Sequence, residues 1–164
     1  MKKALRYSGI ALGIAFFAVQ FFQPPRNLGE PEGPRSIVAQ HKVPADVQQI
    51  LRRSCYDCHS NRTAYPWYAS VQPVGWWLYD HVKEGKRELN FSEFAGYDTK
   101  RAVRRLQSTA DEVRERHMPL SSYLLVHRDA KLSAAEQNTL IAWAKSFGGN
   151  NAGTAAAEEE GEKE

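Results

Sequence analysis

The stretch PADVQQILRRSCYDCHS, residues 44–60, decides how this chain is organised. Its apolar residues recur at intervals of three and four, which predicts a helix with one buried face. They are Val47, Ile50 and Leu51. Pro44 suits the first turn of such a helix, because its missing N–H would have no partner there. Cys55 and Cys58 continue the apolar stripe, so we expect the helix to run to about Cys58 and to stop near Ser60.

Two further helices are expected in the middle of the chain. A short one covers residues 74–82 and is ended by Gly85. Asp98 or Thr99 can cap a longer one, because either side chain can accept a hydrogen bond from a free backbone N–H. The apolar stripe of this longer helix consists of Val103, Leu106, Ala110 and Val113. No segment shows sustained alternation of polar and apolar residues, so the fold is expected to be all-α.

The last helix should begin at Ser133, which forms a capping box with Glu136 three residues later. Its buried face is expected to consist of Leu140, Ile141, Ala144 and Phe147. Gly148 and Gly149 should then end it. The remainder, residues 148–164, is small, Asn-rich and finally acidic, which predicts a disordered tail.

The N-terminus, residues 1–22, has the pattern of an export leader. Lys2, Lys3 and Arg6 precede an uncharged apolar run over residues 8–22. No good cleavage site with small residues precedes the prolines that follow, which favours an uncleaved membrane-anchor helix over a cleaved signal peptide. Either form places the rest of the chain on the periplasmic side of the bacterial inner membrane, and cleavage would leave a soluble periplasmic protein.

Residues 23–43 are rich in proline and glycine, which predicts a semi-extended spacer. Residues 44–147 then suffice for one small domain and are too few for a large doubly wound α/β enzyme. The composition, 42% hydrophobic and 25% charged with 2 cysteines, excludes collagen, a disulfide scaffold and wholesale disorder. The net charge of +3 comes without a dense basic stripe, so nucleic acid is not an expected partner.

Residues 55–59, CYDCH, have the spacing CxxCH. Two thiols three residues apart on one helix face can each add to a vinyl group of a haem and form a thioether. His59 is then held beneath the ring, where a ring nitrogen can ligate the iron. The motif therefore predicts one covalent haem c, attached through Cys55 and Cys58.

Three other uses of the cysteines are less favoured. A structural zinc site needs four ligands and would have to recruit His59 and a distant histidine. A thioredoxin-like redox pair follows a strand and sits at a helix N-terminus, whereas this motif follows a helix. The third alternative is a structural disulfide between Cys55 and Cys58.

A second axial ligand is expected for the iron. Apart from the initiator, Met118 is the only methionine, and Pro119 follows it between two expected helices. A turn there can present the thioether sulfur to the iron; a plain core position is the alternative. His117 and His127 remain open as ligands of a bis-histidine site with a lower reduction potential.

The sequence offers several candidate partners for the haem propionates and does not choose among them. Arg62, Arg104 and Arg105 can each neutralise a propionate, and their spacing selects none of them. His81 fits better as a surface residue or a propionate partner than as a ligand, and His41 lies in the spacer.

Residues 65–94 are rich in aromatic side chains, among them Trp67, Trp76 and Trp77. Their indole N–H groups can bond a propionate, but filling the core is the favoured interpretation. The sequence does not identify what this stretch binds.

In combination these motifs resemble a class I cytochrome c, with CxxCH near the start of the domain, Met-Pro about sixty positions later and a C-terminal amphipathic helix that contains Trp143. More narrowly, CYDCHSNRTAYPWY, GKRELNFSEF and HMPLSSYLLVHRDAKLSAAEQNTLIAWA are similar to the haem-binding domain family of bacterial exported proteins. The similarity covers roughly residues 44–147. It implies covalent haem c, His59 as the proximal ligand and a mainly helical domain. It implies no known reaction, because the family is named for its cofactor.

The best interpretation is a small cytochrome c-like helical domain around one covalent haem, tethered by its N-terminal helix. It would not be an enzyme but would transfer electrons in the periplasm, exchanging them with redox partner proteins. The alternative is a haem-based peroxidase or a gas or redox sensor, in which Met118 leaves the iron readily and His117 assists proton transfer. A third is a haem-stabilised binding module whose aromatic stretch contacts a partner.

Overall fold

A computed structural model describes residues 2–161 of the chain, and side chains from residue 2 to residue 147. The described part is helical, and its β-structure is limited to an isolated bridge between Leu28 and Arg62. The elements, with 3₁₀-helices labelled η, are α1 (Lys2–Val19), α2 (Ile37–Gln40), α3 (Ala45–Ser54), α4 (Tyr56–His59), η1 (Trp67–Ser70), α5 (Val74–Glu88), η2 (Phe91–Gly96), α6 (Thr99–Arg114), α7 (Ser121–Leu124), η3 (Arg128–Ala130) and α8 (Ala134–Gly161). The all-α prediction is confirmed for this part of the chain.

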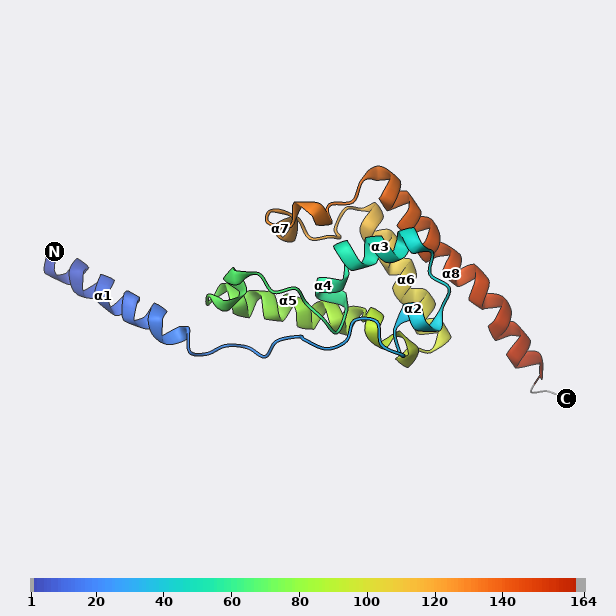
Figure 1. Cartoon of the computed structure of the whole chain (residues 1–164), viewed down its shortest axis with the longest axis horizontal. Coiled ribbons are helices and arrows are strands. Elements are labelled where there is room, and N and C mark those ends of the chain that lie inside the picture. The colour runs from blue at the N-terminus through green and yellow to red at the C-terminus, as the bar shows by residue number, and fades with distance from the viewer. Residues whose placement is uncertain (1, 162–164) are drawn as a thin grey trace.

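The core lies where α6 and α8 run side by side and α3 packs against α8 (Figure 1). Small residues on both long helices, Ala110 and Ala144, are fully buried and let the two backbones approach closely. Large apolar side chains fill the space around them, and each contributes about 1.5–3 kcal/mol on burial. The largest of these are Leu51, Phe91, Phe94, Leu106 and Leu140.

Both predicted helix caps are confirmed. The side chain of Asp98 accepts a hydrogen bond from the backbone N–H of Arg101 at 2.7 Å, at the start of α6. At the start of α8, the backbone N–H of Ser133 donates to the Glu136 carboxylate at 2.8 Å, and the N–H of Glu136 donates back to the Ser133 hydroxyl at 3.3 Å. Arg53 pairs with the same carboxylate at 2.8 Å, so this cap also joins α8 to the end of α3.

Three helix ends differ from the prediction. The first helix breaks at Cys55 (φ −125°, ψ −37°) into α3 and α4. α5 continues past Gly85 to Glu88, and α8 continues past Gly148 and Gly149. A glycine in a helix costs only about 1 kcal/mol, and it ends a helix by adopting positive φ, which no described glycine does. The predicted acidic tail is helical as far as Gly161; its side chains and residues 162–164 lie outside the described part.

The predicted spacer, residues 23–43, packs on the domain instead of standing free. Ile37 in α2 is completely buried in the core. The Asn27 side-chain amide donates to the backbone oxygen of Ser60 at 2.9 Å and to the Thr63 hydroxyl at 3.0 Å. Residues 23–43 therefore connect α1 to the domain while lying against it, through contacts to distant residues that the local composition does not reveal.

The tryptophans predicted to fill the core do not fill it. Trp67 is 82% exposed, Trp77 48% and Trp76 37%. The reason is position: η1 packs mainly against α5, and both lie on the side of the molecule away from the α6–α8 pair (Figure 1). Phe91 and Phe94 in η2 occupy the core instead, each 1% exposed.

Helix α1 extends away from the domain, and none of its side chains is buried (Figure 1). The side chain of Gln20, just beyond its end, bonds the backbone of Gln72 through both its oxygen and its nitrogen. Within residues 2–161, no helix combines the length and the apolar character needed to cross a bilayer.

Candidate functional site

The CxxCH motif occupies the break between α3 and α4. The carbonyl of Cys55 accepts backbone hydrogen bonds from Cys58 at 3.2 Å and from His59 at 2.9 Å, so all three residues belong to one helical turn. Their side chains are half-buried. Because a single turn carries both thiols and the imidazole, the three groups have a fixed mutual arrangement.

The His59 ring is held by the C-terminal end of α5. Its Nδ1 lies 2.9 Å from the backbone oxygen of Gly85 and 3.0 Å from that of Leu89. Carbonyl oxygens only accept, so Nδ1 is the protonated nitrogen and Nε2 carries the free lone pair. Burial lowers the pKa of His59, although the two carbonyls oppose the shift. Burial thus favours the neutral ring, and the Nδ1–H tautomer is the one that a metal-ligating histidine requires.

Gly85 allows α5 to lie directly against the motif. A Cβ at this position would be 2.8 Å from the backbone oxygen of Cys58 and 3.2 Å from its Cβ. Any side chain here would push α5 away from α4, and the carbonyls that hold His59 would move with it. The glycine interpreted as a helix end is thus a close-packing position.

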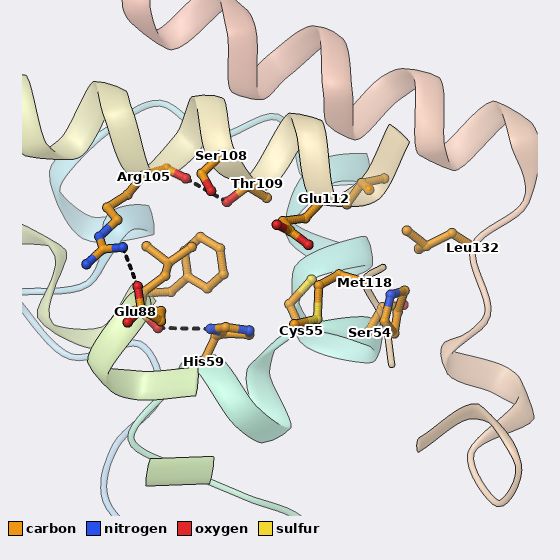
Figure 2. A pocket seen from close by; sticks show the side chains of 14 residues that line it. Ser54, Cys55, His59, Glu88, Arg105, Ser108, Thr109, Glu112, Met118 and Leu132 are labelled. Carbon is orange, nitrogen blue, oxygen red and sulfur yellow. Dashed lines mark hydrogen bonds and ion pairs between the residues drawn. The ribbon is translucent and has the colours of Figure 1, made fainter. Parts of the chain in front are cut away.

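Two adjoining hollows, each about 270 Å³, open beside the motif. Cys55, His59 and Met118 line both of them. Apolar side chains that also line the first hollow are those of Leu89, Phe91, Val113 and Leu132. Polar side chains, Glu88, Arg105 and Glu112 among them, complete its wall (Figure 2). Cys58 lines the second. The structure therefore brings together the four residues that the sequence singled out.

Met118 reaches the hollows because the chain reverses after α6. Arg116 has φ 60°, the left-handed conformation that commonly follows a helix. The backbone N–H groups of His117 and Met118 then both donate to the carbonyl of Glu112, at 2.9 and 3.2 Å. The side chain of Met118 is half-buried and packs against the edge of the core.

Of the other histidines, His117 and His127 lie outside both hollows, and His81 lines the second. His117 is exposed and faces Glu112 and Glu115, at 3.4 and 3.5 Å. His127 stacks on Tyr123 with 4.0 Å between ring centroids and lines neither hollow. His81 does line the second hollow, although the sequence favoured a surface or propionate role for it.

A hydrogen bond joins the segment after Met118 to the motif itself. The hydroxyl of Tyr123 donates to the carboxylate of Asp57 at 2.7 Å. The other oxygen of that carboxylate accepts from the backbone N–H of Ala64 at 2.9 Å. Burial, followed by this hydrogen bond, raises the pKa of Tyr123 well above its usual value. Nothing in the sequence pattern indicated that Asp57 and Tyr123 would meet.

A family model described as a haem-binding domain matches residues 14–146. The chain belongs to the haem-binding domain family. The match includes the whole CxxCH region, both hollows and Met118. No curated protein and no solved structure matches the chain.

The residues of this haem-binding domain fit a haem at the two hollows. Apolar walls suit a macrocycle, His59 offers an unprotonated nitrogen, and Met118 offers a soft sulfur ligand. At the polar end of the first hollow, Arg105 has a buried Nε with no hydrogen-bond partner among the described residues. An unpaired buried donor is costly, and a haem carboxylate is a group that would satisfy it.

The other interpretations of the cysteines find no support in this domain. Burial raises the pKa of the Cys55 thiol to about 12 and that of Cys58 to about 11, whereas a reactive dithiol needs a lowered pKa. Both thiols are free, not joined in a disulfide. Across the described residues, no three His, Cys, Asp or Glu side chains gather where they could hold a zinc ion.

Proposed function

We propose that this protein is a monohaem c-type cytochrome that carries electrons. Cys55 and Cys58 would hold the haem through two thioethers, His59 would be the proximal ligand and Met118 the distal one. The bound haem supplies one-electron chemistry, its iron alternating between the ferric and ferrous states. The observation that carries the proposal is the hydrogen bonding of His59 Nδ1 to two carbonyls, which leaves Nε2 free beside hollows that Met118 also lines.

The chain's own residues have a holding and tuning role in this function. The carbonyls of Gly85 and Leu89 fix the orientation of His59 and increase its basicity as a ligand. Apolar walls such as Phe91 and Leu132 exclude water, and a methionine sulfur favours the ferrous state, so both raise the reduction potential. No acid–base step is needed, which is why we propose a carrier and not an enzyme.

A second candidate function rests on His81. Its Nδ1 faces the backbone oxygen of Trp77 at 2.8 Å, so its Nε2 is the basic nitrogen, and the side chain lines the second hollow with Met118. In a protein whose methionine ligand leaves easily, such a base would assist proton transfer to bound peroxide or a gas. Resting wild-type protein that is high-spin and binds carbon monoxide readily would favour this peroxidase or sensor function.

We further propose that the protein works in the periplasm, held at the membrane by α1. The support is the basic start of α1, its exposed apolar side chains and the short path from its end to the domain. Redox partner proteins would dock near the haem through small, weak interfaces, as electron-transfer partners do.

The test is covalent haem attachment in protein expressed with an export leader and the haem-ligation machinery. Denatured wild type should retain its haem and give a c-type pyridine haemochrome. Cys55→Ala should retain at most one thioether, and His59→Ala should lose the native coordination. A b-type spectrum, or haem that is extracted by acid acetone, would overturn the proposal.

A further inference from the structure

The first hollow has a polar end formed by α6 and the end of α5. Arg105 and Glu88 meet there, with 2.5 Å between Arg105 Nη1 and a carboxylate oxygen of Glu88. The Arg105 side chain is only 26% exposed, and its Nε is buried without a hydrogen-bond partner in the described part of the chain. A guanidinium has five N–H donors, so the pair with Glu88 leaves most of its capacity unused.

This polar end lies opposite the cysteine end. Figure 2 shows Arg105 and Glu88 on one side of the hollow, Cys55 and Met118 on the other, and His59 between them. The vinyl groups of a haem and its two propionates project from opposite edges of the macrocycle. A haem attached at Cys55 therefore directs its propionates towards the end that Arg105 occupies.

Its place in the wall of the first hollow distinguishes Arg105 from the other arginines of this region. Within the described residues, it is the only lysine or arginine that lines either hollow. Arg104, its neighbour on α6, is exposed, and Arg62 lies in the bridge to Leu28. The same hollow carries the carboxylates of Glu88 and Glu112, so a haem carboxylate entering there needs a cation beside it.

We propose that Arg105 binds a haem propionate through its Nε–H, while Glu88 holds the guanidinium in place. The inference rests on the proposed covalent haem c. The Glu88 contact limits the conformations of Arg105, so less side-chain entropy is lost when the propionate binds. Thr109 takes no part, since its hydroxyl already donates to the backbone oxygen of Arg105 at 2.9 Å. Arg105 thus orients the haem by direct contact and offsets its negative charge.

The experiment compares haem-loaded wild type with Arg105→Leu, Arg105→Lys and the matched control Arg104→Leu. Resonance Raman spectra report the propionate bending mode, voltammetry reports the reduction potential, and circular dichroism reports folding. Arg105→Leu should shift the propionate mode and lower the potential, because a cation near the haem favours the ferrous state. Arg105→Lys should shift the mode but lower the potential less, since lysine keeps the charge and lacks the Nε–H. Arg104→Leu should change neither.

Glu88→Gln separates a direct bond from a general charge effect. It removes a negative charge and should raise the potential, while the propionate mode still reports a hydrogen bond from Arg105. A wild-type propionate mode in both Arg105 variants overturns the inference, even if the potential moves. If Arg105→Leu does not fold, the propionate mode in the Raman spectrum of Arg105→Lys tests the inference alone: a shifted mode supports it and a wild-type mode overturns it. Absence of a c-type haemochrome in wild type would instead overturn the proposed function.

Discussion

The Tyr123 hydroxyl donates a 2.7 Å hydrogen bond to the carboxylate of Asp57, and so fastens the loop after Met118 to the middle of the CxxCH motif. The two residues are 66 positions apart in sequence. Both lie at the edge of the site, with Asp57 between the two cysteines and Tyr123 in α7. The bond therefore couples the proposed distal ligand to the proximal side of the haem.

Tyr123→Phe should loosen this coupling without preventing haem attachment. A hydrogen bond to a charged acceptor contributes about 1.5–3 kcal/mol, so we expect unfolding at a lower denaturant concentration. Cyanide should bind the ferric protein faster, because the Met118 loop is released more often. Tyr79→Phe is the control, since Tyr79 is half-buried like Tyr123 but lines neither hollow. Equal cyanide rates for the two variants would contradict this coupling.

Met118→Ala tests the distal ligand. Wild-type ferric protein should be low-spin and show the weak near-infrared band of a sulfur–iron bond. The variant should lose the band, have a lower reduction potential and bind added carbon monoxide in the ferrous state. Met118→His should restore a low-spin site at a still lower potential. His117→Ala and His127→Ala should leave the band intact. If wild type lacks the band and Met118→Ala changes nothing, the assignment passes to His117 or His127, and the alanine variant that opens the iron to added ligands identifies which.

Gly85→Ala should damage the proximal side. The added Cβ would lie 2.8 Å from the backbone oxygen of Cys58, and overpacking of this kind costs about 1–3 kcal/mol. Because the carbonyls that bond His59 belong to Gly85 and to Leu89 at the end of α5, we expect a lower yield of covalent haem as well as a lower melting temperature. The control is Gly96→Ala, where the new Cβ meets only the far end of the Arg35 side chain and no backbone. A Gly85→Ala protein with wild-type yield and stability would disprove the close-packing role.

Glu136 should make stability depend on pH in the acid range. Hydrogen bonding from Ser133 and the pairing with Arg53 lower the pKa of Glu136 to about 2 from its ordinary 4.5. A carboxylate whose folded pKa is depressed stabilises the fold above its unfolded pKa, and this stability is lost as pH falls towards 2. Glu136→Gln should therefore destabilise the protein at pH 7 and make little difference at pH 2. Chemical denaturation at both pH values checks this, with exposed Glu30→Gln as the neutral control.

The proposed membrane tether predicts that the protein sediments with membranes and is released by detergent but not by salt. Mass spectrometry should find the intact N-terminus. A mature N-terminus between residues 18 and 40 would show that α1 is a cleaved leader and that the protein is soluble in the periplasm.

Local features of the sequence were sufficient for most of the helices and for the cofactor class. Caps such as Asp98 on α6 and the Ser133–Glu136 box depend on side chains three residues apart, and they form as expected. The CxxCH motif is likewise local chemistry, and the family match agrees with the haem that it predicts. The helix ends predicted at the glycines 85, 148 and 149 were wrong. A glycine ends a helix by adopting a positive φ, and these glycines keep a negative φ.

What the sequence by itself determined was therefore the helical class, the buried stripes and the haem motif, each carried by residues within a turn or two of one another. Only the tertiary structure decided the tautomer of His59, through carbonyls 26 and 30 positions away. It also placed Met118 at the hollows and His127 outside them. It brought Arg105 to the first hollow, whereas Arg62 and Arg104 lie outside it. Finally, it buried Ile37 of the expected spacer and left Trp67 exposed. The physical reason is that a residue's burial and its hydrogen-bond partners depend on contacts between segments that are distant in sequence. The periodicity within one segment does not indicate which other segment it will contact.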